Sequence, residues 1–126
     1  NMIVQSFKNK GLRGEVIALI SDDADYGLTR EQIAKYADKK MDIDRMRIYS
    51  ECLRNGYEDS IIKIILNTYD YVKEYIDPNA PGGKEHIGYI VDRTGFEEFK
   101  RWALRDVTLP EIAEVMTPMY WKGITY

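Results

Sequence analysis

Residues 57–76 read YEDSIIKIILNTYDYVKEYI, and this stretch decides the expected fold. Its apolar side chains recur at the three- and four-residue spacing of one helical face, at Ile61, Ile65, Tyr69, Val72 and Ile76. Ile62, Ile64 and Leu66 widen this face until little of the first half is left for water. A helix that is apolar on nearly all sides has to be covered from several directions. We therefore predict an all-α fold organised around a central helix over 57–76.

The composition is that of a folded globular protein. With 126 residues, of which 44% are hydrophobic and 31% charged, the chain is expected to form a single domain over residues 1–126. We expect a compact bundle or array of about six short helices. The one cysteine, Cys52, permits no internal disulfide, and its helical setting indicates a buried small residue. With no signal peptide and no long apolar run in view, we expect a cytoplasmic protein that does not contact a membrane.

The clearest local signal is the hexapeptide LTREQI at residues 28–33. Thr29 and Gln32 have the spacing of a capping box, in which each side chain bonds the backbone of the other residue. Leu28 is placed to pack on Ile33 as a hydrophobic staple. A helix is therefore expected to begin here. Its inward-facing residues are predicted to be Ile33, Ala34, Tyr36 and Ala37.

Two further helices are expected on either side of this box. Residues 15–20 are predicted as a short helix that ends in the acidic run 21–25, which we interpret as a solvated turn. A later helix begins at Asp42 or Asp44. It ends at Asn55-Gly56, because glycine tolerates the left-handed conformation that a helix stop requires.

The chain beyond the central helix is less regular. Residues 77–83 are rich in proline and glycine and predict a loop. Residues 84–91 fit either a helix or a short strand, since their apolar positions match both periods. A capped helix is expected to open at Thr94, and residues 107–112 repeat the box and staple.

Two segments of the chain share one pattern. Residues 28–34 and 107–113 each carry an apolar residue, Thr, two variable positions, Gln or Glu, Ile and Ala. Weaker copies begin at Gly56 and Gly123, and Gly27 precedes Gly56 by 29 residues. Either this spacing marks an array of helical repeats, of which the chain would be a truncated fragment, or capping boxes recur simply because they start helices well.

The stretch LTREQIAKYA at 28–37, followed by DIDRM at 42–46 and CLRNG at 52–56, resembles a short two-helix repeat. Such repeats occur in uncharacterised proteins on mobile elements and phages of gut Clostridia and their relatives. The resemblance covers about residues 27–66. It implies a helical array and a mobile-element setting, and it brings no catalytic residues.

The sequence contains no recognisable constellation for catalysis or metal binding. His86 is the only histidine and has no second His or Cys beside it. The acidic run at 22–25 lacks the remaining ligands of a calcium loop, and PGGK at 81–84 lacks the spacing of a phosphate loop. We therefore expect no enzymatic activity and no cofactor.

A DNA-binding protein is one functional alternative. The order of the first helices is that of a helix-turn-helix motif, although the turn is longer than usual. Several aspartates lie among its basic residues and would repel phosphate, and the net charge of −3 opposes broad attraction to nucleic acid. The Asp and Arg spacing also suits i,i+3 pairs on a solvated face. The candidate DNA-contacting residues are Lys39, Lys40, Arg45 and Arg47.

The function that we favour is a non-catalytic helical interaction module whose partner is a protein. The chain contains ten tyrosines, a side chain that supplies contact area at low entropy cost. On a mobile element or phage, a small acidic domain of this kind is a further candidate for an inhibitor of a host defence enzyme. The expected partner-binding surface is formed by the C-terminal residues Met119, Tyr120, Trp121 and Tyr126.

Overall fold

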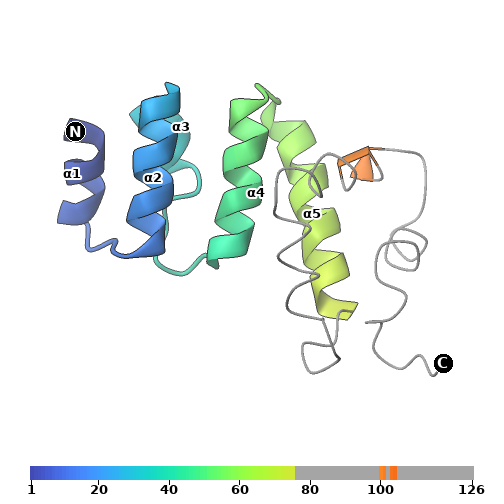
Figure 1. Ribbon diagram of the computed structural model, residues 1–126. Helices are drawn as coiled ribbons and strands as arrows, with labels where there is room; N and C mark the ends of the chain where they lie inside the picture. The colour runs from blue at the N-terminus through green and yellow to red at the C-terminus, as the bar shows by residue number, and fades with distance from the viewer. Residues whose placement is uncertain (76–99, 102, 105–126) are drawn as a thin grey trace. The chain divides into compact units, whose positions relative to one another are not determined.

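A computed structural model describes residues 1–75 together with residues 100, 101, 103 and 104. These residues form helices and turns with no strand among them, which confirms the all-α prediction for the part of the chain that is described. Residues 84–91, for which helix and strand were both open, lie outside it. The helices are α1 (Met2–Asn9), α2 (Glu15–Tyr26), α3 (Arg30–Ala34), α4 (Ile43–Arg54) and α5 (Asp59–Tyr75) (Figure 1).

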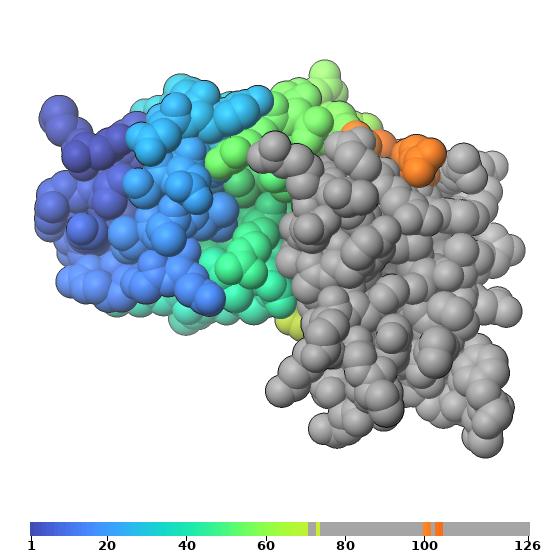
Figure 2. All heavy atoms as spheres, viewed as in Figure 1, coloured from blue at the N-terminus to red at the C-terminus, as the bar shows by residue number. Residues whose placement is uncertain are grey.

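The chain divides into two compact units, Asn1–Tyr57 and Glu58–Tyr126, and each is considered by itself. In the first unit α2 is the middle helix, since it packs against α1, α3 and α4 (Figure 1). The atoms of this unit form a continuous body in the space-filling view (Figure 2). Its buried apolar core consists of Phe7, Leu12, Ile20, Leu28, Ile33, Tyr36, Met46, Ile48, Cys52 and Leu53. The burial expected for Cys52 is thus confirmed.

Three helices of the first unit end in the same way. At the end of α2 the amide of Leu28 donates to the carbonyl of Asp23 at 3.0 Å, and the amide of Gly27 donates to that of Ala24 at 3.2 Å. This pair of bonds is the Schellman motif, and it requires the left-handed backbone that Gly27 adopts at φ 116°. The same pair of bonds closes α1 at Gly11 and α4 at Gly56. The predicted stop at Asn55-Gly56 is confirmed.

Two predicted helix starts are also present, at Thr29 and Asp42, whereas those expected at Thr94 and within residues 107–112 lie outside the described residues. The amide of Gln32 donates to Thr29 Oγ1 at 3.1 Å and the amide of Thr29 donates to Gln32 Oε1 at 2.8 Å, so the capping box is closed on both sides. For α4 the structure decides between the two predicted starts. Asp42 is the capping residue, because its side chain accepts from the amide of Arg45 at 2.8 Å.

The first helices differ from the expectations in two places. No helix was expected in the first ten residues, yet α1 begins directly after Asn1, whose side chain accepts from the amide of Ile3 at 2.8 Å. The helix expected over 15–20 continues to Tyr26. The interpretation of residues 21–25 as a solvated turn is therefore wrong, since Asp23 is fully buried and has polar partners inside the unit.

The inward face of α3 is narrower than its sequence indicated. Ile33 and Tyr36 are buried as predicted, whereas Ala37 is half-buried and Ala34 is exposed. Tyr36 and Ala37 follow the end of α3 at Ala34, so their burial is set by the turn after the helix and not by the helical spacing used for the prediction.

In the second unit α5 confirms the predicted long helix over most of its length. Ile62, Ile65, Leu66 and Tyr69 are buried. Ile64, however, is 46% exposed, so the first half of α5 is not covered on all sides as was expected. The side chains at 71 and 72 are outside the description, as is residue 76. The central place of this helix in the whole chain stays a prediction.

Candidate functional site

The carboxylate of Asp23 is the polar centre of the first unit. It is fully buried and accepts three hydrogen bonds. The donors are the Tyr36 hydroxyl at 2.6 Å, the Ser50 hydroxyl at 2.7 Å and Arg54 Nε at 2.7 Å. A buried charge is tolerated only when it is paired and hydrogen-bonded, and these donors meet both conditions. The cluster joins α2, the segment after α3, and α4.

Tyr36 is held in its protonated form by this environment. Burial is the largest cause of a raised pKa, and the hydrogen bond to Asp23 and the negative charge of that carboxylate raise the pKa of Tyr36 further. The hydroxyl therefore remains a donor far above the usual titration range of tyrosine. Both Tyr36 and Asp23 are inaccessible to solvent, so a substrate could not reach them. The cluster therefore serves to fix the packing of the helices and is not a reactive site.

Arg54 extends the cluster toward the surface. Its side chain is 16% exposed, and its guanidinium carbon lies 4.6 Å from the centre of the Tyr26 ring, within cation–π range. The Tyr26 hydroxyl in turn donates to the backbone carbonyl of Arg54 at 3.4 Å. The end of α2 is thereby tied to the end of α4.

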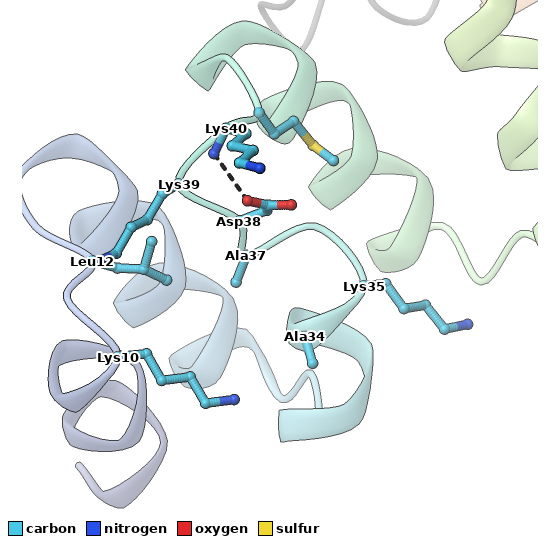
Figure 3. Close-up of a pocket in the computed structure, with 9 residues that line it drawn as sticks. Lys10, Leu12, Ala34, Lys35, Ala37, Asp38, Lys39 and Lys40 are labelled. Carbon is cyan, nitrogen blue, oxygen red and sulfur yellow. Dashed lines mark hydrogen bonds between the residues drawn. The ribbon is translucent and has the colours of Figure 1, made fainter.

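The first unit also carries an open basic cleft of about 410 Å³ (Figure 3). The side chains of four lysines and one aspartate line it beside apolar groups, and the side chain of Lys35 extends away from the other three lysines in Figure 3. The groups come from the end of α1, the end of α3 and the connection between α3 and α4. We call it the lysine cleft, lined by Lys10, Leu12, Ala34, Lys35, Ala37, Asp38, Lys39, Lys40 and Met41.

The local structure explains why lysines gather at this place. Lys10 follows the last turn of α1, and Lys35 follows the last turn of α3, where the helix dipole favours positive charge. Asp38 Oδ1 accepts from the backbone amide of Lys40 at 2.9 Å, which fixes the turn that carries Lys39 and Lys40. In Figure 3 the side chain of Lys39 extends back toward Leu12, so the connection reaches the end of α1.

The structure separates the four residues predicted to contact DNA. Lys39 and Lys40 line the lysine cleft, whereas Arg45 and Arg47 belong to α4 and are not among its lining residues. The guanidinium of Arg47 lies 3.3 Å from the carboxylate of Asp44 and 3.9 Å from that of Glu15. The guanidinium of Arg45 contacts the sulfur of Met41 at 3.9 Å.

Sequence reasoning missed two of the four lysines that line the cleft. Lys10 and Lys35 are far from each other in the chain, and Lys35 lies within the repeat-like stretch 28–37, to which no binding role was assigned. Their positions after the ends of two helices are the only signal that could have pointed to them. Even this signal does not reveal that the two helix ends lie beside one cleft, because that depends on the packing of α1 and α3 around α2.

The other predicted site is not part of the described chain. The expected partner-binding residues Met119, Tyr120, Trp121 and Tyr126 all lie outside the residues that the structure describes, as does His86. Within residues 1–75 and the short piece near residue 100, no group of three or more His, Cys, Asp or Glu side chains could hold a metal ion. Nor does this part of the chain contain a helix long and apolar enough to cross a membrane.

Comparison with known proteins gives partial matches to two curated proteins of the same name. A segment of 67 residues is 37% identical to part of an anaerobic sulfite reductase subunit from Salmonella typhimurium strain LT2, and the Salmonella typhi protein of the same name matches equally. The match covers 51% of this chain but only 18% of those relatives. No family model matches the chain, and no solved structure matches it.

Proposed function

We propose that this chain is a non-catalytic helical interaction module that binds a protein partner. The observation that carries this proposal is the lysine cleft, an open, charged surface with a volume of about 410 Å³. It is built from helix ends: the end of α1 is closed by a Schellman motif, and the segment after α3 is joined to the buried Asp23 through the Tyr36 hydroxyl. A preorganised surface loses less entropy on binding.

Several features favour a protein partner over nucleic acid. Two of the four residues needed for a DNA-reading helix do not line the cleft, and one of them, Arg47, already has two carboxylates near its guanidinium. The whole chain carries a net charge of −3, which opposes approach to a polyanion. The connection between α3 and α4 is also longer than the turn of a helix-turn-helix motif, since α3 ends at Ala34 and α4 starts at Ile43.

DNA binding is the second candidate, and one observation favours it. Lys39 and Lys40 lie together with two more lysines, a grouping that suits phosphate as well as carboxylate. If the chain reads DNA, Arg45→Ala and Lys40→Ala are expected to weaken binding and to lower its dependence on salt.

The wider setting of the module rests on the resemblance of residues 27–66 to repeats of mobile elements and phages. That setting supports a cytoplasmic array of helical repeats in which the whole chain packs as one bundle. The reductase relative is by name one subunit among others, which also suits a segment used in protein contacts. Inhibition of a host defence enzyme is a special case of the same proposal. Because the lysine cleft is basic, it would not inhibit such an enzyme by imitating the negative charge of nucleic acid.

The proposal is tested with the full chain in two parallel assays. Immobilised chain is expected to retain a specific protein from a lysate of gut anaerobes, identified by mass spectrometry. Fluorescence anisotropy with mixed-sequence duplex DNA is expected to show no binding at about 50 mM salt, where electrostatic binding is strongest. Salt-sensitive binding to the duplex without any retained protein would overturn the proposal in favour of the DNA reader.

A further inference from the structure

We propose that the lysine cleft binds an acidic segment of the partner, a short peptide in which Asp or Glu side chains flank an apolar residue. This inference rests on the proposed function and names the chemistry of its site. The carboxylates would lie against the ammonium groups of the rim, and the apolar side chain would lie against the wall of the cleft.

The positive charge of the cleft favours an anionic ligand. Lys10, Lys39 and Lys40 bring positive charge to it, Lys35 lines its edge with a side chain that extends away from these three (Figure 3), and Asp38 is the one carboxylate among its lining residues. The Asp38 carboxylate also accepts the amide of Lys40, so it is oriented by the turn that carries the lysines. Placing like charges around one cleft raises its electrostatic potential, and bound carboxylates lower that energy.

The wall of the cleft is also suited to contact an apolar side chain of the bound peptide. Ala34 is exposed, and Ala37 and Met41 are half-buried, so apolar atoms remain accessible between the lysines. The methylene stems of the lysine side chains add to this apolar area while their ammonium groups stay in water. Methionine adapts well to varied binding partners because its side chain is unbranched and polarizable.

These features suit a peptide better than a nucleic-acid backbone. A phosphate backbone places charges along an extended line and needs cations along that line. On α4 the cation Arg47 is flanked by Asp44 and Glu15, and Asp42 stands at the start of the same helix. A peptide that inserts a few side chains into one compact cleft avoids these carboxylates.

The inference is tested by anisotropy, with the full chain and a fluorescein-labelled peptide in which two leucines lie between runs of glutamate. We expect saturable binding that weakens between about 50 and 200 mM salt. The decisive variant is Ala34→Glu, which adds a carboxylate at an exposed position of the cleft and should weaken binding about tenfold, roughly the effect of 1.4 kcal/mol. Ala34→Gln is its size-matched control and should bind nearly as well as the wild type.

A second pair of variants checks the lysines themselves. The double variant Lys39→Gln, Lys40→Gln should lose at least about tenfold in affinity. Lys8→Gln removes an exposed lysine of α1 that does not line the cleft and should change little. All of these positions are exposed, so circular dichroism is expected to show unchanged helicity. A peptide with glutamine in place of glutamate should not bind.

Three outcomes would overturn the inference. The first is that the glutamate peptide does not bind. The second is that Ala34→Glu and Ala34→Gln lower the affinity for the peptide equally. The third is that single-stranded oligothymidylate binds more tightly than the peptide and depends on the same lysines. If the peptide fails while a protein is still retained by the Lys39→Gln, Lys40→Gln chain, only this inference fails. If the peptide binds but no protein is ever retained, the proposed function fails instead.

Discussion

At the scale of single residues, the most consequential side chain is Asp23. A fully buried carboxylate costs several kcal/mol unless its partners replace water, and here three donors from other parts of the unit do so. Such a cluster adds less to stability than its hydrogen bonds suggest, because the charge must first be desolvated. Its geometry instead restricts how α2, Tyr36 and α4 can pack, since other arrangements leave the carboxylate without donors.

The variant Tyr36→Phe tests this cluster. Removing one donor from a buried carboxylate should lower the free energy of unfolding by about 1–3 kcal/mol at neutral pH. The pKa of Tyr36 is raised in the folded chain, so the folded state favours the protonated hydroxyl. The stability contributed by Tyr36 is therefore complete below the unfolded pKa of about 10 and falls as the pH rises above it.

Urea unfolding of the wild type and of Tyr36→Phe at pH 7 and at about pH 11 separates this effect from the other titrations, which both proteins share. The difference in the free energy of unfolding should shrink by about 1.4 kcal/mol per pH unit above about pH 10. A difference that stays constant with pH would show that the Tyr36 hydroxyl is not buried against Asp23.

At the scale of elements, the first unit is a set of short helices whose ends are specified more strongly than their interiors. α3 contains only five residues, too few to be stable alone, and depends on its capping box and on the burial of Ile33. The Schellman motifs after α1, α2 and α4 each turn the chain sharply within about two residues. After α1 and α2 a buried leucine follows the glycine, Leu12 and Leu28, and it attaches the turn to the core.

The variant Gly27→Ala tests the role of these turns. Gly27 has φ 116°, and no heavy atom lies within 4 Å of an added Cβ, so the cost arises from backbone strain alone. We expect a loss of about 1–2 kcal/mol in the free energy of unfolding. Thermal unfolding followed by circular dichroism measures it, with Ala18→Ser on the exposed side of α2 as a control that should change the midpoint little. An unchanged midpoint for Gly27→Ala would mean that α2 does not end in a Schellman motif.

At the scale of the whole molecule, the chain offers two candidate surfaces for its partner. The lysine cleft is basic on a chain of net charge −3, and the aromatic C-terminal residues were predicted from the sequence as a contact surface. The two surfaces differ in chemistry, so their contributions respond differently to salt.

Capture of the partner by variants of the full chain distinguishes the two surfaces. If the lysine cleft carries the interaction, Ala34→Glu should clearly reduce the amount of captured partner, and Tyr120→Ala with Trp121→Ala should leave it largely intact. Raising the salt concentration should then release the partner. Loss of capture with the aromatic variants alone, without salt dependence, would place the interaction on the C-terminal residues.

The sequence by itself determined the helical class and the ends of several helices. Capping boxes and Gly stops act through neighbouring backbone atoms, so Thr29, Gln32 and Gly56 could be assigned correctly from local spacing, whereas Asp42 and Asp44 both remained open as the start of α4. The apolar spacing of residues 57–76 likewise predicted α5, although Ile64 remains exposed.

Only the tertiary structure decided the burial of Asp23 and the existence of the lysine cleft. Asp23 and Arg54 are 31 residues apart in the sequence. No local rule indicates that the carboxylate of Asp23 will be buried or that it will form an ion pair with Arg54. The end of α1 with Lys10 and the connection at 38–41 line one cleft because α1 and α3 both pack on α2. Charge, burial and cleft formation depend on which helices are neighbours in space, and that is set by packing between elements rather than by spacing within them.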